Sequence, residues 1–306
     1  MKRKIKAAAV QEAPVYLDKE ATVEKAVELI RQAAKSGIEL AVFPEVFLSG
    51  YPDWIWLIPN SRAAELNPLY AQLLENAIDI PGPETNALCD VARETGMHLV
   101  MGVHERNTER SGSSIFNTII FIDDQGKLLG KHRKLMPTGG ERLVWAQGEG
   151  HTLAVYPTSI GKLGGLICWE NFMPLARMSL YLQGVQILAA PTWDKSRQWL
   201  TAMQHIAREG GMFVISCCAA MTMDDLPDNL GFKALYPPGR QWINTGQSCV
   251  VGPKGNILAG PADADKTFVT AELDLGEIFE AKRMFDVAGH YHRPDVFHFS
   301  LATLSD

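Results

Sequence analysis

Three polar residues of different chemistry each follow an apolar segment of strand length. Glu45 comes after LAVFP, Lys134 after LLGKHR, and Cys168 after GGLI. Because open α/β sheets bind their ligands beyond the carboxyl ends of strands, we expect these side chains to lie close together. A carboxylate can take the proton of a thiol, and an ammonium can stabilise the negative charge that develops when the thiolate attacks. The pattern therefore favours a cysteine nucleophile with a base and a cationic stabiliser.

Cys168 stands where a predicted strand gives way to a predicted helix, and backbone N–H groups at such a junction favour the thiolate. Each residue also has a purely structural interpretation. Cys168 could be a small buried apolar side chain, Glu45 a helix cap and Lys134 a solvated strand end. The remaining cysteines fall within helix or strand patterns and are interpreted as structural; they are Cys89, Cys217, Cys218 and Cys249.

The composition is that of an ordinary globular chain. Its 306 residues are 46% hydrophobic and 21% charged, and the net charge of −6 gives no electrostatic footprint for nucleic acid. The basic start MKRKIK is followed only by the short apolar run AAAV, so no secretion signal is expected. No run approaches the roughly 18 apolar residues of a membrane span. Five cysteines, an odd number, fit no disulfide framework, and a cytoplasmic protein without membrane contact is expected.

Helix and strand patterns alternate along the chain, but hairpins interrupt them. Apolar spacing predicts helices near residues 23–36, 69–77, 84–95, 174–183 and 196–209. Strands are predicted at 5–11, 40–43, 98–103, 115–122, 127–134, 152–156, 162–168, 185–190, 212–218, 248–252, 257–260 and 267–273. A long loop is predicted over residues 223–245. We therefore expect one α/β domain with mixed sheets over residues 1–285 and a C-terminal extension over residues 286–306.

Four segments, in this order, resemble the nitrilase superfamily of carbon–nitrogen hydrolases, and its nitrilase branch in particular. The similarity extends from about Ile5 to Phe297. The segments are AVFPEVFLSGYP (41–52), KHRKLMPTGGERLVW (131–145), GGLICWENFMPLAR (164–177) and AGHYHRPDVF (288–297). CWEN and RPDVF are typical of the nitrilase branch, whereas amidase branches usually differ at both places.

The resemblance implies that Glu45, Lys134 and Cys168 form the family's catalytic triad. It also implies that Glu141, inside GGERLVW, is an additional glutamate of the active site. The family fold is an α/β four-layer α-β-β-α sandwich with two mixed β-sheets, which would explain the mixture of helices and hairpins. No metal or organic cofactor is implied, and a homo-oligomer built from dimers is expected.

Two departures from the family pattern stand out. Gly139 and Gly140 precede Glu141 where bulkier residues are expected, which leaves the size of the substrate open. The chain also stops soon after RPDVF, without the long tail linked with filament assembly in some relatives. We therefore expect limited filament growth.

Aromatic residues near the motifs are candidates for substrate binding, although each could equally pack on the core. They are Tyr51, Trp54, Trp169 and Trp193. His290 and His292 could suggest a metal pair, but no cysteine or acidic cluster stands nearby, so no metal is predicted. The glycines of GKLGG match neither GxGxxG nor a P-loop, so nucleotide binding is not predicted.

Three functions remain open: a nitrile hydrolase, an amidase or carbamoylase with the same triad, and a non-catalytic binding protein of this fold. The intact triad argues against the third, and CWEN with RPDVF favours the first over the second. We therefore predict a nitrilase that converts a small organic nitrile into the carboxylic acid and ammonia. The reaction would pass through a covalent cysteine thioimidate and then a thioester.

Overall fold

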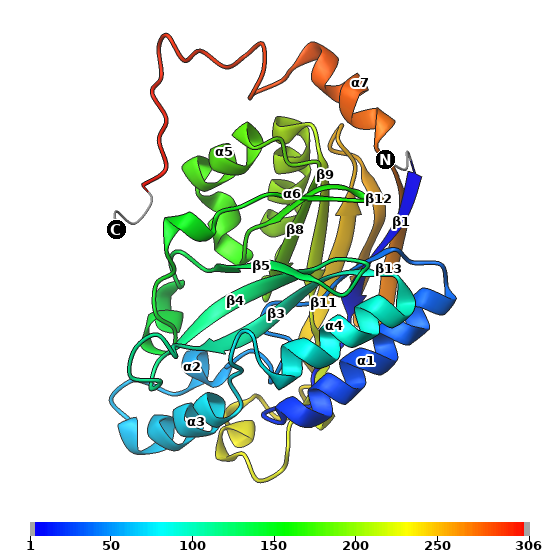
Figure 1. Ribbon diagram of the computed structural model, residues 1–306. Helices are drawn as coiled ribbons and strands as arrows, with labels where there is room; N and C mark the ends of the chain where they lie inside the picture. Colours follow the sequence, from blue (N-terminus) through cyan, green and yellow to red (C-terminus); the bar gives the residue numbers. More distant parts are fainter. Residues whose placement is uncertain (1–3, 303–306) are drawn as a thin grey trace.

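Helices cover the outer faces of two stacked β-sheets (Figure 1). The computed structural model describes residues 4–302. The helices are α1 (Lys19–Lys35), α2 (Trp54–Leu57), α3 (Ala63–Glu75), α4 (Pro83–Thr95), α5 (Pro174–Leu182), α6 (Arg197–Gly210) and α7 (Gly276–Met284). The strands are β1 (Lys4–Gln11), β2 (Leu40–Val42), β3 (His98–Arg106), β4 (Ile115–Ile122), β5 (Leu128–Arg133), β6 (Tyr156–Thr158), β7 (Gly161–Gly165), β8 (Ile187–Thr192), β9 (Phe213–Cys218), β10 (Ala220–Thr222), β11 (Trp242–Val251), β12 (Ile257–Asp263) and β13 (Thr267–Asp274).

The first sheet joins strands from both ends of the chain. Within the described residues its order is β13-β1-β2-β3-β4-β5. Strands β1, β2 and β3 run parallel, β13 pairs antiparallel with β1, and β4 and β5 follow as antiparallel strands. Since β2 and β5 point the same way, their carboxyl ends lie at the same edge of the sheet. Glu45 and Lys134 follow these two ends.

The second sheet comes from the later part of the chain. In the described part of the chain its order is β10-β11-β9-β8-β7-β6, with β12 paired to β11. Strands β7, β8 and β9 are parallel, and β6 and β11 are antiparallel to their neighbours. The carboxyl end of β7 leads to Cys168. The nucleophile expected from the sequence therefore comes from a different sheet than Glu45 and Lys134.

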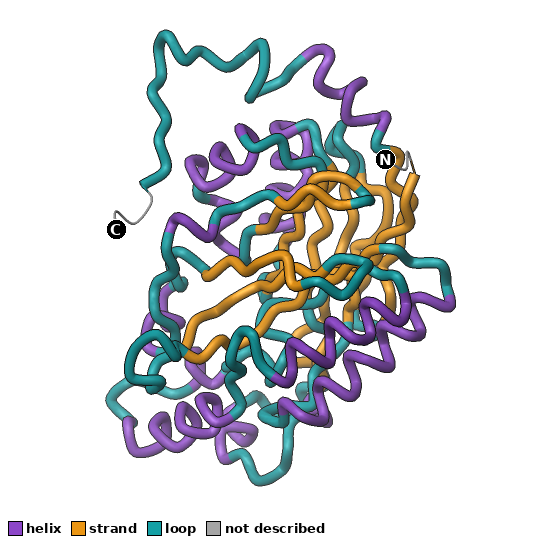
Figure 2. The backbone as a smooth tube through the Cα atoms, in the orientation of Figure 1, coloured by secondary structure: helices purple, strands orange, loops and turns teal. Residues whose placement is uncertain are grey.

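Apolar side chains fill the space between the layers. Ile119, Phe121, Leu163 and Ile187 belong to the core between the two sheets. Helices α1 and α4 pack on the outer face of the first sheet, and α5 and α6 pack on that of the second. Figure 2 shows the strands in the centre with these helices outside. The molecule is thus a four-layer α-β-β-α sandwich, which confirms the predicted fold class.

Caps mark the ends of α1 and α6; α6 lies where the sequence predicted it, whereas α1 begins four residues before the predicted helix. Asp18 accepts a hydrogen bond from the Ala21 N–H at 2.9 Å at the start of α1. Ser196 likewise accepts from the Trp199 N–H at 3.2 Å at the start of α6. That helix ends at Gly211, whose φ of +57° is the left-handed conformation that glycine adopts at little cost.

The strand predicted over residues 152–156 is wrong except for Tyr156, which begins β6. Side chains satisfy the backbone there in place of a neighbouring strand. The Thr152 hydroxyl donates to the Glu149 carbonyl at 2.8 Å, and the Val155 N–H donates to the Gln183 side chain at 3.0 Å. The predicted loop 223–245 is also interrupted, because β11 begins at Trp242.

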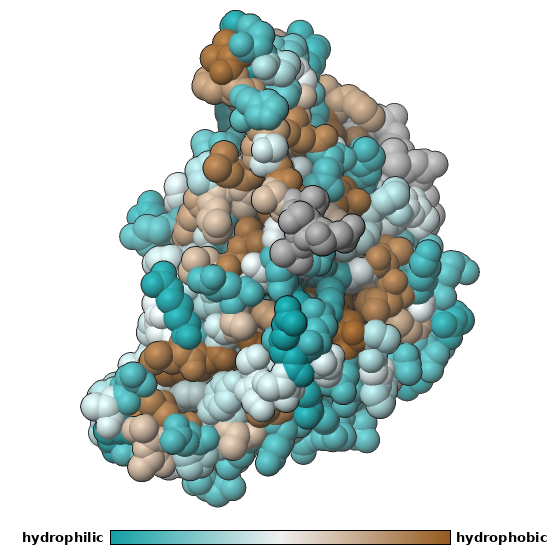
Figure 3. Space-filling model, turned by 60° about the vertical axis from the view of Figure 1, so that its left-hand side comes forward, coloured by the Kyte–Doolittle hydropathy of each residue, from teal (hydrophilic) through white to brown (hydrophobic). Residues whose placement is uncertain are grey.

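Helices α2 and α7 were not predicted. Helix α2 spans only one turn, and α7 leaves Phe279 and Met284 each 67% exposed, so its sequence lacks a clear buried face. Figure 3 shows apolar side chains exposed over the upper part of the molecule, where α5, α7 and the segment after α7 lie. Surfaces of this kind are typical of protein–protein contacts, and the expected homo-oligomer stays a prediction. Among residues 4–302, no helix is long and apolar enough to cross a membrane.

We expect Phe121→Ala to destabilise the protein by about 3–5 kcal/mol, because it leaves a cavity between the two sheets. Phe121 is fully buried and its ring lies 4.9 Å from that of Tyr156. Urea unfolding measures the change. Phe279→Ala is the matched control, since that side chain is exposed and should change the unfolding free energy little. Equal effects of the two substitutions would contradict the packing described here.

Candidate active site

Glu45 lies in a tight bend that follows β2. The Leu48 N–H donates to the Gly102 carbonyl of β3 at 3.1 Å, which holds the bend against that strand. A Cβ at Gly102 would overlap the carbonyl oxygen of Pro44. Glycine at this position therefore allows the bend to approach closely, and Glu45 ends 2% exposed.

The ammonium of Lys134 lies between two carboxylates. Its Nζ is 2.8 Å from Glu45 Oε1 and 2.7 Å from Glu141 Oε2, and its side chain is fully buried. Asn117 donates through Nδ2 to the same oxygen of Glu45 at 2.7 Å. The Lys134 N–H also donates to the Asn117 carbonyl at 2.8 Å. Strand β4 thus holds both the lysine and the carboxylate in place.

Glu141 belongs to the 3₁₀-helix Gly139–Leu143 and is buried. The Thr138 N–H donates to its Oε2 at 2.6 Å, and the Tyr51 hydroxyl donates to its Oε1 at 2.7 Å. Both oxygens are therefore fixed in addition to the contact with Lys134. The structure brings Glu141 beside the lysine, and its part in the active site stays a prediction.

Cys168 begins the 3₁₀-helix Cys168–Phe172 with a φ of +50°. Residues other than glycine rarely adopt this left-handed conformation, and such strain is concentrated at functional sites. The cysteine is 5% exposed, and the Thr192 hydroxyl donates to its Sγ at 3.1 Å. The strained, nearly buried thiol is thus held by the end of β8.

The charges of this cluster act on one another. Burial raises the pKa of the Cys168 thiol, and Glu45 adds to this rise while Lys134 opposes it. Burial also raises the pKa of Glu45, against the attraction of Lys134. For Lys134 burial favours the neutral amine, but Glu45, Cys168 and Glu141 together raise its pKa, so it stays an ammonium. Burial, which the sequence did not show, thus favours the neutral thiol over the predicted thiolate.

A cavity of about 330 Å³ lies beside the thiol. Its lining residues are Tyr51, Trp56, Thr138, Glu141, Cys168, Trp169, Trp193, Asp194 and Ser196. The rings of Tyr51 and Trp193 stack with their centroids 4.7 Å apart. Trp169 donates through Nε1 to Asp194 at 2.9 Å. Trp54, in contrast, is 2% exposed in the apolar cluster near α2 and α3 and does not line this cavity.

Trp56 packs against the two glycines before Glu141. A Cβ at Gly139 would lie 3.3 Å from the indole ring, and one at Gly140 would lie 3.4 Å from it. The indole N–H of Trp56 donates to the Tyr51 hydroxyl at 3.2 Å, and half of the residue is exposed. An indole from α2 therefore occupies space beside the loop at the positions where bulkier residues were expected.

His104 supports the backbone and the rings around the cluster. The indole N–H of Trp145 donates to His104 Nδ1 at 3.1 Å, so Nδ1 is an acceptor and Nε2–H donates to the Gly50 carbonyl at 3.0 Å. Gly50 precedes Tyr51, and the Trp145 ring lies 5.6 Å from the Lys134 ammonium. Burial lowers the pKa of His104 to about 4, although the bond to Gly50 opposes this. The ring is therefore neutral at neutral pH.

Sequence interpretation missed Asn117, Thr192 and Trp56. Asn117 had a signal, because it and Thr118 are the polar side chains in the otherwise apolar segment IFNTIIFI. Thr192 precedes the predicted Trp193, and Trp56 follows the predicted Trp54 by two residues. Neutral residues of this kind carry no recognisable chemistry until the fold places them beside charged groups.

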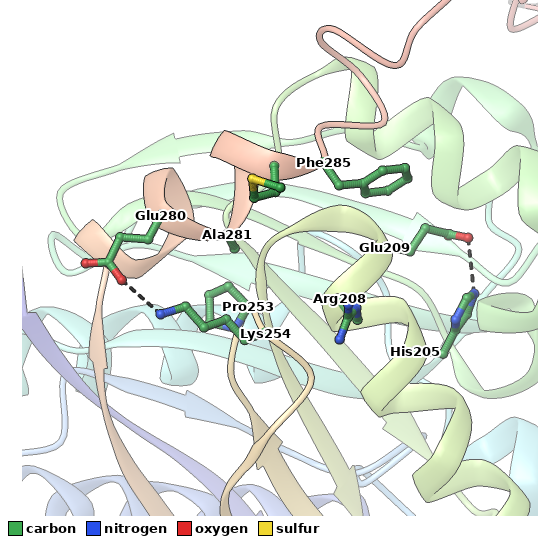
Figure 4. Close-up of a pocket in the computed structure, with 9 residues that line it drawn as sticks. His205, Arg208, Glu209, Pro253, Lys254, Glu280, Ala281 and Phe285 are labelled. Atoms are coloured by element: carbon green, nitrogen blue, oxygen red, sulfur yellow. Dashed lines mark hydrogen bonds and ion pairs between the residues drawn. The ribbon is translucent and has the colours of Figure 1, made fainter.

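A larger hollow of about 630 Å³ lies away from this chemistry, between α6, the β11–β12 turn and α7 (Figure 4). Along it Lys254 donates to Glu280 at 2.9 Å, and His205 Nε2 lies 3.3 Å from Glu209. No cysteine is among its lining residues in the described part of the chain. The thiol and the charge cluster make the smaller cavity the candidate active site.

The metal interpretation of His290 and His292 finds no support in the described residues. His290 Nε2 lies 3.3 Å from the Met284 carbonyl. Along residues 4–302, no group of three histidine, cysteine or acidic side chains is arranged to hold a metal ion.

The model of the carbon–nitrogen hydrolase family matches residues 6–283. The chain belongs to this family. Nitrilase 1 of Arabidopsis thaliana is 44% identical over 298 residues, which cover 95% of this chain and 85% of that protein. The bifunctional nitrilase/nitrile hydratase NIT4B of Nicotiana tabacum is 42% identical and covers 95% of this chain and 84% of its own length. The resemblance to the nitrilase branch of the superfamily is thereby confirmed.

A solved structure shows the same fold within this family. The crystal structure of Nit3 from Saccharomyces cerevisiae, a member of branch 10 of the nitrilase superfamily, superimposes with a TM-score of 0.75. The match covers 96% of this chain and 98% of that one at 23% identity, so it concerns the fold alone. Family membership and the curated relatives make the protein a carbon–nitrogen hydrolase enzyme.

We expect the stability that neutral His104 provides to be lost in acid. Its pKa is about 4 in the folded protein against the ordinary 6.5, so the unfolded chain binds more protons between these values. The free energy of unfolding should therefore fall as the pH drops from about 6.5 to about 4. Urea unfolding across this range should show a steeper loss for the native protein than for His104→Gln. The same dependence of the unfolding free energy on pH in both proteins would contradict a lowered pKa of His104.

Proposed function

We propose that this enzyme hydrolyses a small organic nitrile to the carboxylic acid and ammonia. Cys168 is the nucleophile, Glu45 the base, Lys134 the stabilising cation and Glu141 a second carboxylate that holds the lysine. The observation that carries the proposal is the buried ammonium between Glu45 and Glu141, at 2.8 and 2.7 Å, whose charge acts on the thiol. The names of the relatives at 44% and 42% identity support a nitrile as substrate.

Glu45 has an oxygen to accept the thiol proton. Its Oε1 accepts from Lys134 and Asn117, whereas its buried Oε2 has no hydrogen-bond partner among the described residues. Because the resting thiol is neutral, a base at this position is needed when Cys168 attacks the nitrile carbon. The product of attack is a thioimidate. During the attack the nitrogen gains negative character, which Lys134 and the backbone N–H of Trp169 stabilise, and the proton that Glu45 took from the thiol then passes to this nitrogen.

Water then adds to the thioimidate carbon, and Glu45 takes a proton from the water and passes it to the nitrogen. The tetrahedral intermediate carries the cysteine sulfur, a hydroxyl and an amino group. Breaking the carbon–nitrogen bond releases ammonia and leaves a thioester, which a second water hydrolyses to the acid and free Cys168. Breaking the carbon–sulfur bond instead releases an amide. The two-part name of the Nicotiana relative supports such a branch in this family.

The lining of the cavity favours an uncharged, planar substituent on the nitrile. Trp56, Trp169 and Trp193 contribute large apolar faces. Glu141 and Asp194 are the charged side chains along the described lining, and both are acidic. A substrate that carries its own carboxylate would therefore meet charge of the same sign.

We expect the purified protein to release ammonia from benzonitrile and from phenylacetonitrile faster than from the corresponding amides. Cys168→Ala should abolish this release with an unchanged melting temperature, because a methyl group cannot attack and the site is small. A coupled ammonia assay measures the rates. Mass spectrometry with a slow nitrile should show an adduct on Cys168 of the native chain only.

Faster turnover of the amides would favour the alternative, an amidase or carbamoylase with the same residues. An adduct on Cys217, Cys218 or Cys249 would contradict the assignment of the nucleophile. Those thiols are buried, and none of them is among the lining residues of the cavity beside Cys168.

We expect Glu141→Gln to lower turnover about 10²–10³-fold, the order found when a group that stabilises the transition state is lost. The substitution keeps the shape of the side chain but removes the charge that holds Lys134. Steady-state kinetics measures the fall. Glu149→Gln is the matched control, because that carboxylate is partly exposed and only weakly contacts Arg133, at 3.3 Å. Equal activity of Glu141→Gln and Glu149→Gln would show that Glu141 has no role in turnover and would limit the proposed site to Glu45, Lys134 and Cys168.

A further inference from the structure

The glutamate of the CWEN segment has no part in the chemistry described so far, yet it is among the most buried charged groups of the chain. The side chain of Glu170 has no exposed surface, and its position is two residues after the nucleophile. A buried carboxylate is costly unless several donors surround it. The hydrogen-bond donors around Glu170 therefore indicate the role of its carboxylate.

Glu170 receives hydrogen bonds from both sides of the site. The Leu135 N–H donates to Oε1 at 2.6 Å, and the Ile167 N–H donates to Oε2 at 2.8 Å. Leu135 directly follows Lys134, and Ile167 directly precedes Cys168. One carboxylate thus joins the backbone beside the cation to the backbone beside the nucleophile, although the two come from different sheets.

His132 completes this arrangement. Its Nε2 lies 3.1 Å from each oxygen of Glu170, and its Nδ1 is hydrogen-bonded to the Thr152 hydroxyl at 2.9 Å. Burial by itself raises the pKa of Glu170, but His132 and the two backbone donors lower it below the usual range. The carboxylate is therefore ionised, and the two backbone hydrogen bonds to it, at 2.6 and 2.8 Å, are charge-assisted and short.

We propose that Glu170 is a positioning residue that fixes the separation between the Lys134 ammonium and the Cys168 thiol, and that it thereby sets how the tetrahedral intermediate divides between acid and amide. The inference rests on the proposed function. Loss of ammonia breaks the carbon–nitrogen bond and needs a proton on the departing nitrogen. Loss of the thiolate breaks the carbon–sulfur bond, returns the proton to sulfur and leaves the amide.

Cleavage of the carbon–nitrogen bond and cleavage of the carbon–sulfur bond require different positions of Lys134 relative to the intermediate. Departure of ammonia requires the cationic cluster to lie close to the nitrogen, whereas departure of sulfur requires only that the strained segment at Cys168 relaxes away. A larger separation between Lys134 and Cys168 therefore slows the departure of ammonia more than the departure of sulfur. Glu170 holds that separation short through its hydrogen bonds to the Leu135 and Ile167 N–H groups.

Glu170→Gln tests the proposal, because its amide nitrogen must face either the Leu135 N–H or the Ile167 N–H and so removes one connection. We expect kcat to fall about 10–100-fold, since a misplacement of about 1 Å can cost 10²-fold in rate. The KM should change little, and the fraction of amide in the product should rise several-fold. Product ratios from chromatography, with active sites titrated by thiol alkylation, separate this effect from a loss of folded protein.

Asp225→Asn is the matched control, since Asp225 also accepts from a backbone N–H, that of Thr222 at 2.7 Å, and pairs with Lys266. It lies outside the lining of the active-site cavity and should leave the amide fraction unchanged. If Glu170→Gln does not fold, His132→Gln keeps both backbone bonds and should raise the amide fraction more weakly. A native amide fraction in folded Glu170→Gln, or in His132→Gln in its place, overturns the inference. If the native protein hydrolyses no nitrile at all, it is the proposed function that fails.

Discussion

The structure of the site depends on one buried ammonium. Lys134 has no exposed side-chain surface, and a charge removed from water is tolerated only where opposite charges and hydrogen bonds compensate it. Glu45 and Glu141 supply that compensation, and Asn117, Tyr51 and the Thr138 N–H hold the two carboxylates in turn. The bend after β2, the end of β5 and the 3₁₀-helix at Gly139–Leu143 are thus arranged around a single charge.

The proposed nucleophile comes from the other sheet. Cys168 follows β7 of the second sheet, while Glu45 and Lys134 follow strands of the first. The apolar core between the sheets, which contains Phe121 and Ile119, therefore sets the distance between Cys168 and the groups of the first sheet. Glu170 adds hydrogen bonds that join the end of the first sheet at Leu135 to the end of the second sheet at Ile167. Apolar packing and hydrogen bonding therefore both fix the distance between Cys168 and the Lys134 cluster.

The sequence predicted the parts of the site that have both a recognisable chemistry and a fixed place after a strand. Glu45, Lys134 and Cys168 were of this kind, and the alternation of helices and strands gave the α/β class. Glu141 came only from the resemblance, because a glutamate between two glycines and an apolar segment looks like a surface loop. Its burial depends on Tyr51, ninety positions earlier, and on the lysine.

Other parts could not be predicted because they depend on contacts between distant segments. Trp56 was passed over for Trp54, and only the space above Gly139 and Gly140 shows why the indole at position 56 lines the cavity. The strand expected at 152–156 failed for the same reason, since the Gln183 side chain, from a later segment, satisfies the backbone at Val155. Local apolar patterns contain neither contact.

The charge of the cluster has a consequence for the end of the proposed reaction. The cluster holds two carboxyl groups, Glu45 and Glu141, against the one ammonium of Lys134, and the cavity beside it is lined by the acidic side chains of Glu141 and Asp194. A neutral nitrile enters this field without penalty, but hydrolysis turns it into an acid that ionises in place. The newly formed anion is then repelled by the residues that made it, so product inhibition should be weak and turnover directional.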